Sequence, residues 1–148
     1  MTKNFATLPN TITPATGDAE PGTYDMLRDS LRNVPDIVGM VLLSNDGLAV
    51  AAYGIDTAEA QRIAAACGGM ASLANNLSEA VLGGTVHHQV LAMQARNIIV
   101  TACGDGSTLL VVVRASAQVG LALAETARKA RAYAEQMTTR PRADLPTR

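Results

Sequence analysis

Two short turns, Asn45-Asp46-Gly47 and Gly104-Asp105-Gly106-Ser107, each stand between two runs of apolar residues. Asn and Asp hydrogen-bond their own backbone in turns, and Gly takes a positive φ without steric cost. A connection this short joins antiparallel strands, because parallel strands need a crossover of a dozen or more residues. The chain is therefore expected to fold around an antiparallel sheet built from hairpins.

Apolar periodicity predicts five strands and three helices. Runs rich in Ile, Val and Leu predict the strands, and apolar residues recurring every three or four positions predict the helices. Thr57 is expected to cap the second helix, and Gly83-Gly84 to end it. The order is α-β-β-α-β-β-β-α, an α/β fold whose helices can cover both faces of a five-stranded sheet. The expected strands are residues 37–43, 48–53, 86–93, 96–103 and 108–113, and the expected helices are 24–33, 57–81 and 117–137.

The chain of 148 residues fits one domain with tails. Residues 1–22 carry three prolines among Thr, Asn and Gly, with few large apolar groups, which predicts a disordered N-terminal arm. Residues 140–148 carry two prolines and are predicted to form a flexible C-terminal tail. The folded domain is expected to cover residues 23–139.

Composition excludes several classes of function. The net charge is −1 and no basic stripe precedes Arg128, so nucleic-acid binding is not expected. No apolar run approaches the roughly 20 residues of a membrane span, and no signal pattern opens the chain, so a cytoplasmic protein without membrane insertion is predicted. Only four aromatic residues are present, which argues against a cofactor pocket.

No cluster of catalytic or metal-binding residues stands out. The glycine-rich stretch 104–108 leads into a strand rather than a helix, so it lacks the helix end that cradles phosphate. His87 and His88 are neighbours on a predicted strand and point to opposite faces, so they cannot chelate one metal together. Cys67 lies on an apolar helix face, and Cys103 ends a strand. No catalytic, cofactor-binding or metal-binding residue is predicted.

Asp46 has two readings. An exposed Asp beside a Gly can be a catalytic or metal-binding carboxylate, or it can stabilise the bend of a hairpin. The turn chemistry of Asn45-Asp46-Gly47 accounts for all three residues, so Asp46 is predicted to be structural.

The long helix over residues 57–81 has two unlike faces. One is a continuous apolar stripe. The opposite face has small and mostly uncharged polar residues where a solvated helix usually carries Lys, Arg and Glu. Its residues are Gln61, Ala65, Gly68, Ser72, Asn75, Asn76 and Glu79. Gly68-Gly69 costs the helix up to ~1 kcal/mol each relative to Ala. Close approach of another backbone would offset that cost, although a weakly stable surface helix is the alternative. The apolar stripe is Ile63, Cys67, Met70, Ala74, Leu77 and Val81.

The chain resembles the Roadblock/LC7 family. The resemblance covers about residues 24–137 and rests on "VPDIVGMVLLSNDGLAVAAYG", on the helix containing "AAACGGMASLANNL", and on "IIVTACGDGSTLLVVV". It implies a profilin-like α/β/α sandwich, homodimers that pair their third strands, and non-enzymatic control of small Ras-like GTPases. The chain looks most like the actinobacterial, conservon-type members. Those members imply a multiprotein complex with a sensor-kinase-like protein and membrane association only through partners.

Two contact regions are expected, one on the strand 86–93 and one on the long helix. The strand 86–93 has no charged residue to guard its edge, and an unguarded edge tends to pair with another chain.

Ligand sensing or enzymatic activity on the same sandwich remains the alternative function. The expected dimer contacts are Val86, His88, Val90 and Leu91 on the strand with Ala65, Gly68 and Ser72 on the long helix, and the expected partner contacts are Arg62, Leu73 and Asn76.

Overall fold

The computed structural model describes residues 13–14 and 33–139, with side chains over residues 33–136. The helix expected over residues 24–33 lies outside this part of the chain except for Asn33, which is helical. The described elements are β1 (Thr13–Pro14), β2 (Ile37–Leu43), β3 (Ala49–Tyr53), α2 (Thr57–Val81), β4 (His88–Ala92), β5 (Arg96–Ala102), β6 (Thr108–Arg114) and α3 (Val119–Thr139).

The strands form one antiparallel sheet in the order β1-β3-β2-β6-β5-β4. The five expected strands are all present. The structure adds β1 from the arm that was expected to be disordered, where Thr13 pairs with Ala52 and Pro14 with Ala51. The unpaired backbone groups along the outer edge of β3 give these two residues a ladder to join.

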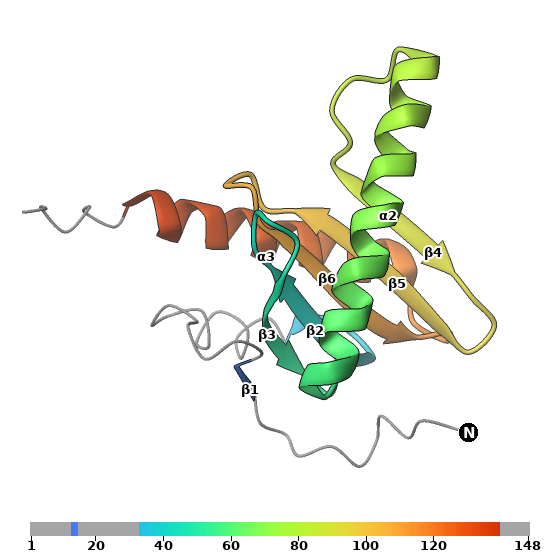
Figure 1. The fold of residues 1–148 in the computed structure, drawn as a ribbon. Coiled ribbons are helices and arrows are strands. Elements are labelled where there is room, and N and C mark those ends of the chain that lie inside the picture. The colour runs from blue at the N-terminus through green and yellow to red at the C-terminus, as the bar shows by residue number, and fades with distance from the viewer. Residues whose placement is uncertain (1–12, 15–32, 140–148) are drawn as a thin grey trace, which may run out of the picture.

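The two helices cover opposite faces of the sheet, so the expected α/β sandwich is confirmed (Figure 1). Successive residues of a strand point to opposite faces, which gives each strand one set of side chains for each helix. Met40, Leu42 and Ile99 pack in the same buried cluster as Ala122 and Tyr133 of α3.

The other face packs against the first half of α2. Val41, Val100 and Val112 share a cluster with Ala60 and Ala64 of the helix. The small side chains on α2 let its backbone lie close to the sheet, as close packing of a helix on a strand surface requires. Both faces of the central strands are therefore buried.

The ends of α2 differ from expectation by one residue. Asp56, rather than Thr57, is the N-cap, and its Oδ1 accepts a hydrogen bond of 2.9 Å from the Glu59 backbone N–H. At the other end Leu82, rather than a glycine, takes the left-handed conformation with φ of 55°. Its neighbour Gly83 donates from N–H to the Ser78 carbonyl at 2.8 Å, which closes the last turn in a Schellman arrangement.

The second half of α2 has no sheet beneath it. Figure 1 shows the helix crossing the sheet and projecting past β4 before the chain returns to that strand. The buried residues of α2 are Ala60, Ala64 and Cys67, all in its first half, whereas Leu77 and Val81 are 68% and 74% exposed. The apolar stripe is continuous in sequence, but only part of it contributes to the core of this chain.

Candidate interaction surface

The projecting part of α2 carries an exposed apolar flank, which we define as Leu73, Leu77 and Val81. These residues are spaced by four along the helix, so they lie on one side of it. Each is at least 66% exposed. A row of large apolar side chains open to solvent on one helix side is typical of a surface that another protein covers.

The strand β4 lies at the edge of the sheet and pairs only with β5 among the described elements. Val86 and His87, expected in this strand, precede it. The Met93 N–H donates to the Arg96 carbonyl at 3.1 Å, and the Ala102 N–H donates to the His87 carbonyl at 3.2 Å. The N–H and C=O groups of successive residues point to opposite sides of a strand. Because residues 87 and 93 bond to β5, the even-numbered residues of β4 turn their N–H and C=O groups away from β5. The residues facing the open edge are His88, Val90 and Ala92.

The side chains of β4 are exposed on both faces. Leu91 is the register partner of Ile98, which packs on the α2 side of the sheet, and directly opposite residues share a face. Leu91 and the apolar flank therefore lie on the same side of the sheet. Val90 is opposite Ile99 and faces the α3 side. Val90 and Leu91 are 43% and 42% exposed, so both are available for contact.

The small residues of α2 form a separate surface, the small-residue face, which we define as Ala65, Gly68 and Ser72. All three are exposed. A Cβ atom added at Gly68 or Gly69 would meet nothing within 4 Å, so packing within this chain does not require glycine there. The Ser72 hydroxyl donates to the Gly68 carbonyl at 3.2 Å, within the helix itself.

The three expected partner contacts lie along one side of α2, between the small-residue face and the apolar flank. Arg62, Leu73 and Asn76 are all exposed. The Arg62 guanidinium donates to the Glu59 carboxylate at 3.1 Å, one turn earlier on the helix. The structure thus brings the expected residues onto neighbouring parts of one helix surface, with Leu73 also belonging to the apolar flank.

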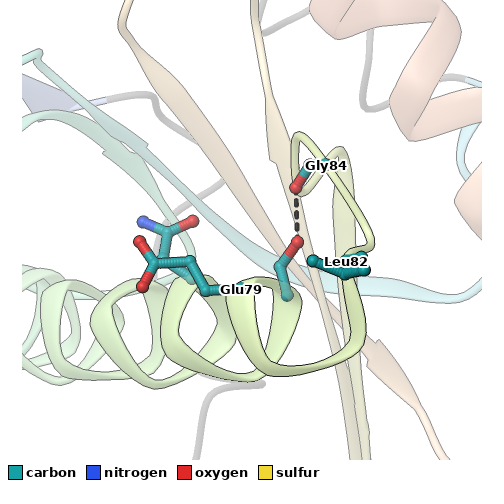
Figure 2. Close-up of a pocket in the computed structure, with 5 residues that line it drawn as sticks. Glu79, Leu82 and Gly84 are labelled. Carbon is teal, nitrogen blue, oxygen red and sulfur yellow. Dashed lines mark hydrogen bonds between the residues drawn. The ribbon is translucent and has the colours of Figure 1, made fainter.

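An open hollow lies at the C-terminal end of α2 (Figure 2). It is lined by Asn75, Ser78, Glu79, Leu82 and Gly84. The Ser78 hydroxyl donates to the Gly84 carbonyl, and Figure 2 shows Glu79 and Leu82 on either side of that contact. Glu79 is the one titratable group in this lining, so the hollow lacks the pair of groups that acid–base or nucleophilic chemistry needs.

The cysteines are placed as buried apolar groups rather than as nucleophiles. Burial raises the pKa of the Cys67 thiol. Burial, opposed by a hydrogen bond with Ser107, raises the pKa of Cys103 to about 11. Because the thiolate is the reactive form, burial disfavours the reactivity of both thiols.

Histidines and acids do not converge into a metal site in the described part of the chain. Over residues 33–136, no group of three His, Cys, Asp or Glu side chains could hold a metal ion. The rings of His87 and His88 lie 6.2 Å apart with their planes tilted by 49°.

Asp46 lies in the turn between β2 and β3. The Gly47 N–H donates to the Ser44 carbonyl at 3.0 Å, and the Ser44 hydroxyl donates to the Asp46 carboxylate. Gly47 has a φ of 81°, the backbone conformation for which glycine is favoured. The geometry is that of a hairpin turn stabilised by its own side chains.

We expect Asp46→Asn to leave stability and partner binding almost unchanged, within about 0.5 kcal/mol. The asparagine amide retains an oxygen that accepts from Ser44, and both residue types suit the turn. Urea unfolding and partner-binding measurements on the purified variant check this. A large loss of binding without loss of stability would instead assign the carboxylate to the contact surface.

The sequence matches a known protein family. The Roadblock/LC7 domain profile matches residues 23–113, more than half of the chain. This protein belongs to the Roadblock/LC7 family. The profile match ends before α3, and that helix packs on the same sheet.

Solved structures confirm the fold of this Roadblock/LC7 domain. A Roadblock/LC7 domain from Streptomyces avermitilis is 27% identical, with a TM-score of 0.68 over 75% of this chain and 93% of that one. MglB from Myxococcus xanthus is 14% identical, with a TM-score of 0.71 over 82% of this chain and all of that one. The gliding protein MglB from Thermus thermophilus is 18% identical, with a TM-score of 0.61 over 75% and 84% of the two chains. No curated protein matches the chain.

Membrane insertion finds no support in the helices of this Roadblock/LC7 domain. Among the described residues, no helix combines the length and the apolar character that spanning a bilayer requires.

Proposed function

We propose that this Roadblock/LC7 domain is a dimeric, non-enzymatic regulator or scaffold that binds a small Ras-like GTPase. Two features of the structure carry the proposal. The strand β4 lies at an open edge of the sheet, and the apolar flank of α2 projects past β4 on the α2 side of the sheet. Family membership supports the GTPase as the partner. A sensor-kinase-like protein is the further partner, and any membrane association is made through it.

A second copy of the chain can cover both the open edge of β4 and the apolar flank, which is why we propose a dimer. A second β4, paired antiparallel with the first about a two-fold axis, continues the sheet by several strands. That continued sheet lies beneath the projecting half of α2, where the apolar flank then meets the exposed apolar residues of the second copy. Each subunit covers the other, which makes the contact self-complementary.

The small-residue face is left outward in this arrangement. We assign it, together with Arg62 and Asn76, to the GTPase, and Leu73 to the dimer. This assignment exchanges the roles expected from the sequence for Leu73 and for Ala65, Gly68 and Ser72. The reason is that large exposed apolar side chains gain most from burial between subunits, whereas small residues permit a partner backbone to approach.

Capture of a Ras-like GTPase from the same organism tests the partner. The GTPase is loaded with GDP or with a non-hydrolysable GTP analogue, immobilised, and exposed to the purified chain. Binding in at least one nucleotide state is expected, with an unrelated GTPase as the control. Failure of both loaded forms to bind would refute GTPase regulation and leave the dimer untouched.

Two arginine substitutions on opposite sides of α2 separate the contact surfaces. Leu77→Arg buries an unpaired charge between subunits and is expected to weaken the dimer by roughly 3–5 kcal/mol, by analogy with broken buried ion pairs. Ser72→Arg is expected to change dimer affinity by less than about 0.5 kcal/mol, because that face is solvated in the dimer. Ser72→Arg should instead abolish GTPase capture.

Analytical ultracentrifugation, GTPase capture and circular dichroism on both variants check these outcomes. Leu77→Arg serves as the charge-matched control for Ser72→Arg, since each adds one arginine to the same helix. A weaker dimer in Ser72→Arg with an unchanged dimer in Leu77→Arg would reverse the assignment of the two faces.

A further inference from the structure

The strand β3 is buried on both faces although it would be an edge strand without β1. Ala51 belongs to the buried cluster on the α3 side and Ala52 to the cluster on the α2 side, and they are 0% and 2% exposed. The strand reads Ala49-Val50-Ala51-Ala52-Tyr53, with no charge and no proline. The Ala49 N–H and C=O bond the side-chain amide of Gln61 at 3.3 and 3.2 Å. Without β1 the rest of the outer backbone edge would be open, and an edge of this composition invites pairing with another chain.

That outer edge is occupied by β1. Thr13 and Pro14 pair antiparallel with Ala52 and Ala51. Pro14 has no backbone N–H, so β1 cannot offer a complete ladder to a further strand on its own outer side. A very short edge strand that contains proline is one of the devices by which proteins stop sheet extension.

We propose that Thr13–Pro14 is a guard strand that keeps the β3 edge from pairing with a second copy of the chain. The opposite edge, β4, has no such cover among the described residues. A sheet with one guarded edge and one open edge pairs once and stops, which gives a closed dimer. A sheet with two open edges pairs at both and gives a growing assembly. The dimer part of this argument rests on the proposed function, but the guarding of β3 does not.

Two truncations that differ only in the guard strand test the proposal. Removal of residues 1–10 leaves Thr13–Pro14 in place, and removal of residues 1–16 deletes it. We expect the chain lacking residues 1–16 to form assemblies at least about twofold larger than the full chain at equal concentration. The chain lacking residues 1–10 should match the full chain. Light scattering gives the masses, and circular dichroism confirms the fold.

A full-length variant covers the case in which the longer truncation does not fold. Replacing both Thr13 and Pro14 with glycine keeps the chain length and weakens the strand, because glycine disfavours extended pairing and offers no side chain to pack. The mass should rise in the same direction. Folded chains whose mass stays equal to that of the full chain would overturn the proposal.

The pairing itself is tested by disulfide formation in the full chain. Cysteines at positions directly opposite in an antiparallel pair are close enough to bridge. Thr13→Cys with Ala52→Cys is therefore expected to cross-link on mild oxidation. Thr13→Cys with Ala51→Cys is the matched control and should not, since Ala51 and Ala52 face opposite sides of the sheet. Equal cross-linking of the two pairs would contradict the register of β1.

Failure of dimerisation through β4 and failure of the guard strand at β3 would give different results. If the full chain is a monomer at every concentration, pairing through β4 is wrong. The guard strand is then still tested by whether its removal raises the mass above that monomer.

Discussion

Replacing Val90 with proline is expected to weaken the proposed dimer by about 4 kcal/mol, roughly a 1,000-fold loss of affinity. Each subunit would lose the outward hydrogen bond of its residue 90 N–H, and the two acceptors would stay unpaired. Val90 is the middle one of the residues of β4 that face the open edge, so a partner strand centred on β4 uses its N–H. The same orientation means that the ladder to β5 does not involve this N–H. The substitution therefore separates dimerisation from folding.

Val90→Ala is the control for this prediction. It removes most of the side chain but keeps the backbone donor, so its dimer affinity should fall far less than that of Val90→Pro. Sedimentation over a range of concentrations gives both affinities, and circular dichroism reports the fold. A folded Val90→Pro chain that dimerises as tightly as the original chain would exclude β4 as the dimer strand.

Gly54→Ala is expected to lower the free energy of unfolding by about 3 kcal/mol. Gly54 has a φ of 65°, and a left-handed conformation costs a non-glycine residue roughly 1–2 kcal/mol. A Cβ atom there would lie 2.4 Å from the Val38 carbonyl oxygen, which is backbone and cannot move freely. Forcing the strands apart adds roughly 1–3 kcal/mol.

Gly47→Ala is the matched control, because it shares the left-handed backbone but not the clash. Gly47 has a φ of 81° and nothing within 4 Å of an added Cβ. Its substitution should cost only the conformational part, about 1 kcal/mol. Urea unfolding with unchanged slopes gives both values. Equal losses in the two variants would show that the chain relaxes around Gly54 at no cost.

Local chemistry made the elements predictable from sequence. The bounds of β2 and α2 match the expected ranges, and β6 differs by one residue. Turn residues such as Asp46 and Gly47 act on their own backbone, and helix periodicity is a property of neighbouring residues. The predicted N-cap, Thr57, is one residue too late, because Asp and Thr are both good caps and stand side by side here. Asp56 has the extended backbone of an N-cap, and its side chain accepts from the Glu59 N–H.

The contact surface was predictable only in part. The small residues Ala65, Gly68 and Ser72 stand out in sequence because a solvated helix rarely has them together. The apolar flank does not stand out, since Leu77 and Val81 continue the same stripe as buried Cys67. Whether a stripe is core or surface depends on where the sheet ends beneath the helix. A helix of 25 residues is about 37 Å long, longer than this sheet supports.

Strand order separates what the sequence determines from what it leaves open. Turn chemistry and apolar periodicity are local, so the sequence specifies the strands, the hairpins and the long helix with its glycine pair. The order β1-β3-β2-β6-β5-β4 arises from pairing between residues far apart in the chain. That order places β4 at an open edge, brings Thr13–Pro14 against β3, and sends half of α2 past the sheet. Edges and overhangs are properties of the assembled sheet, because a strand has a free side only once its neighbours are known.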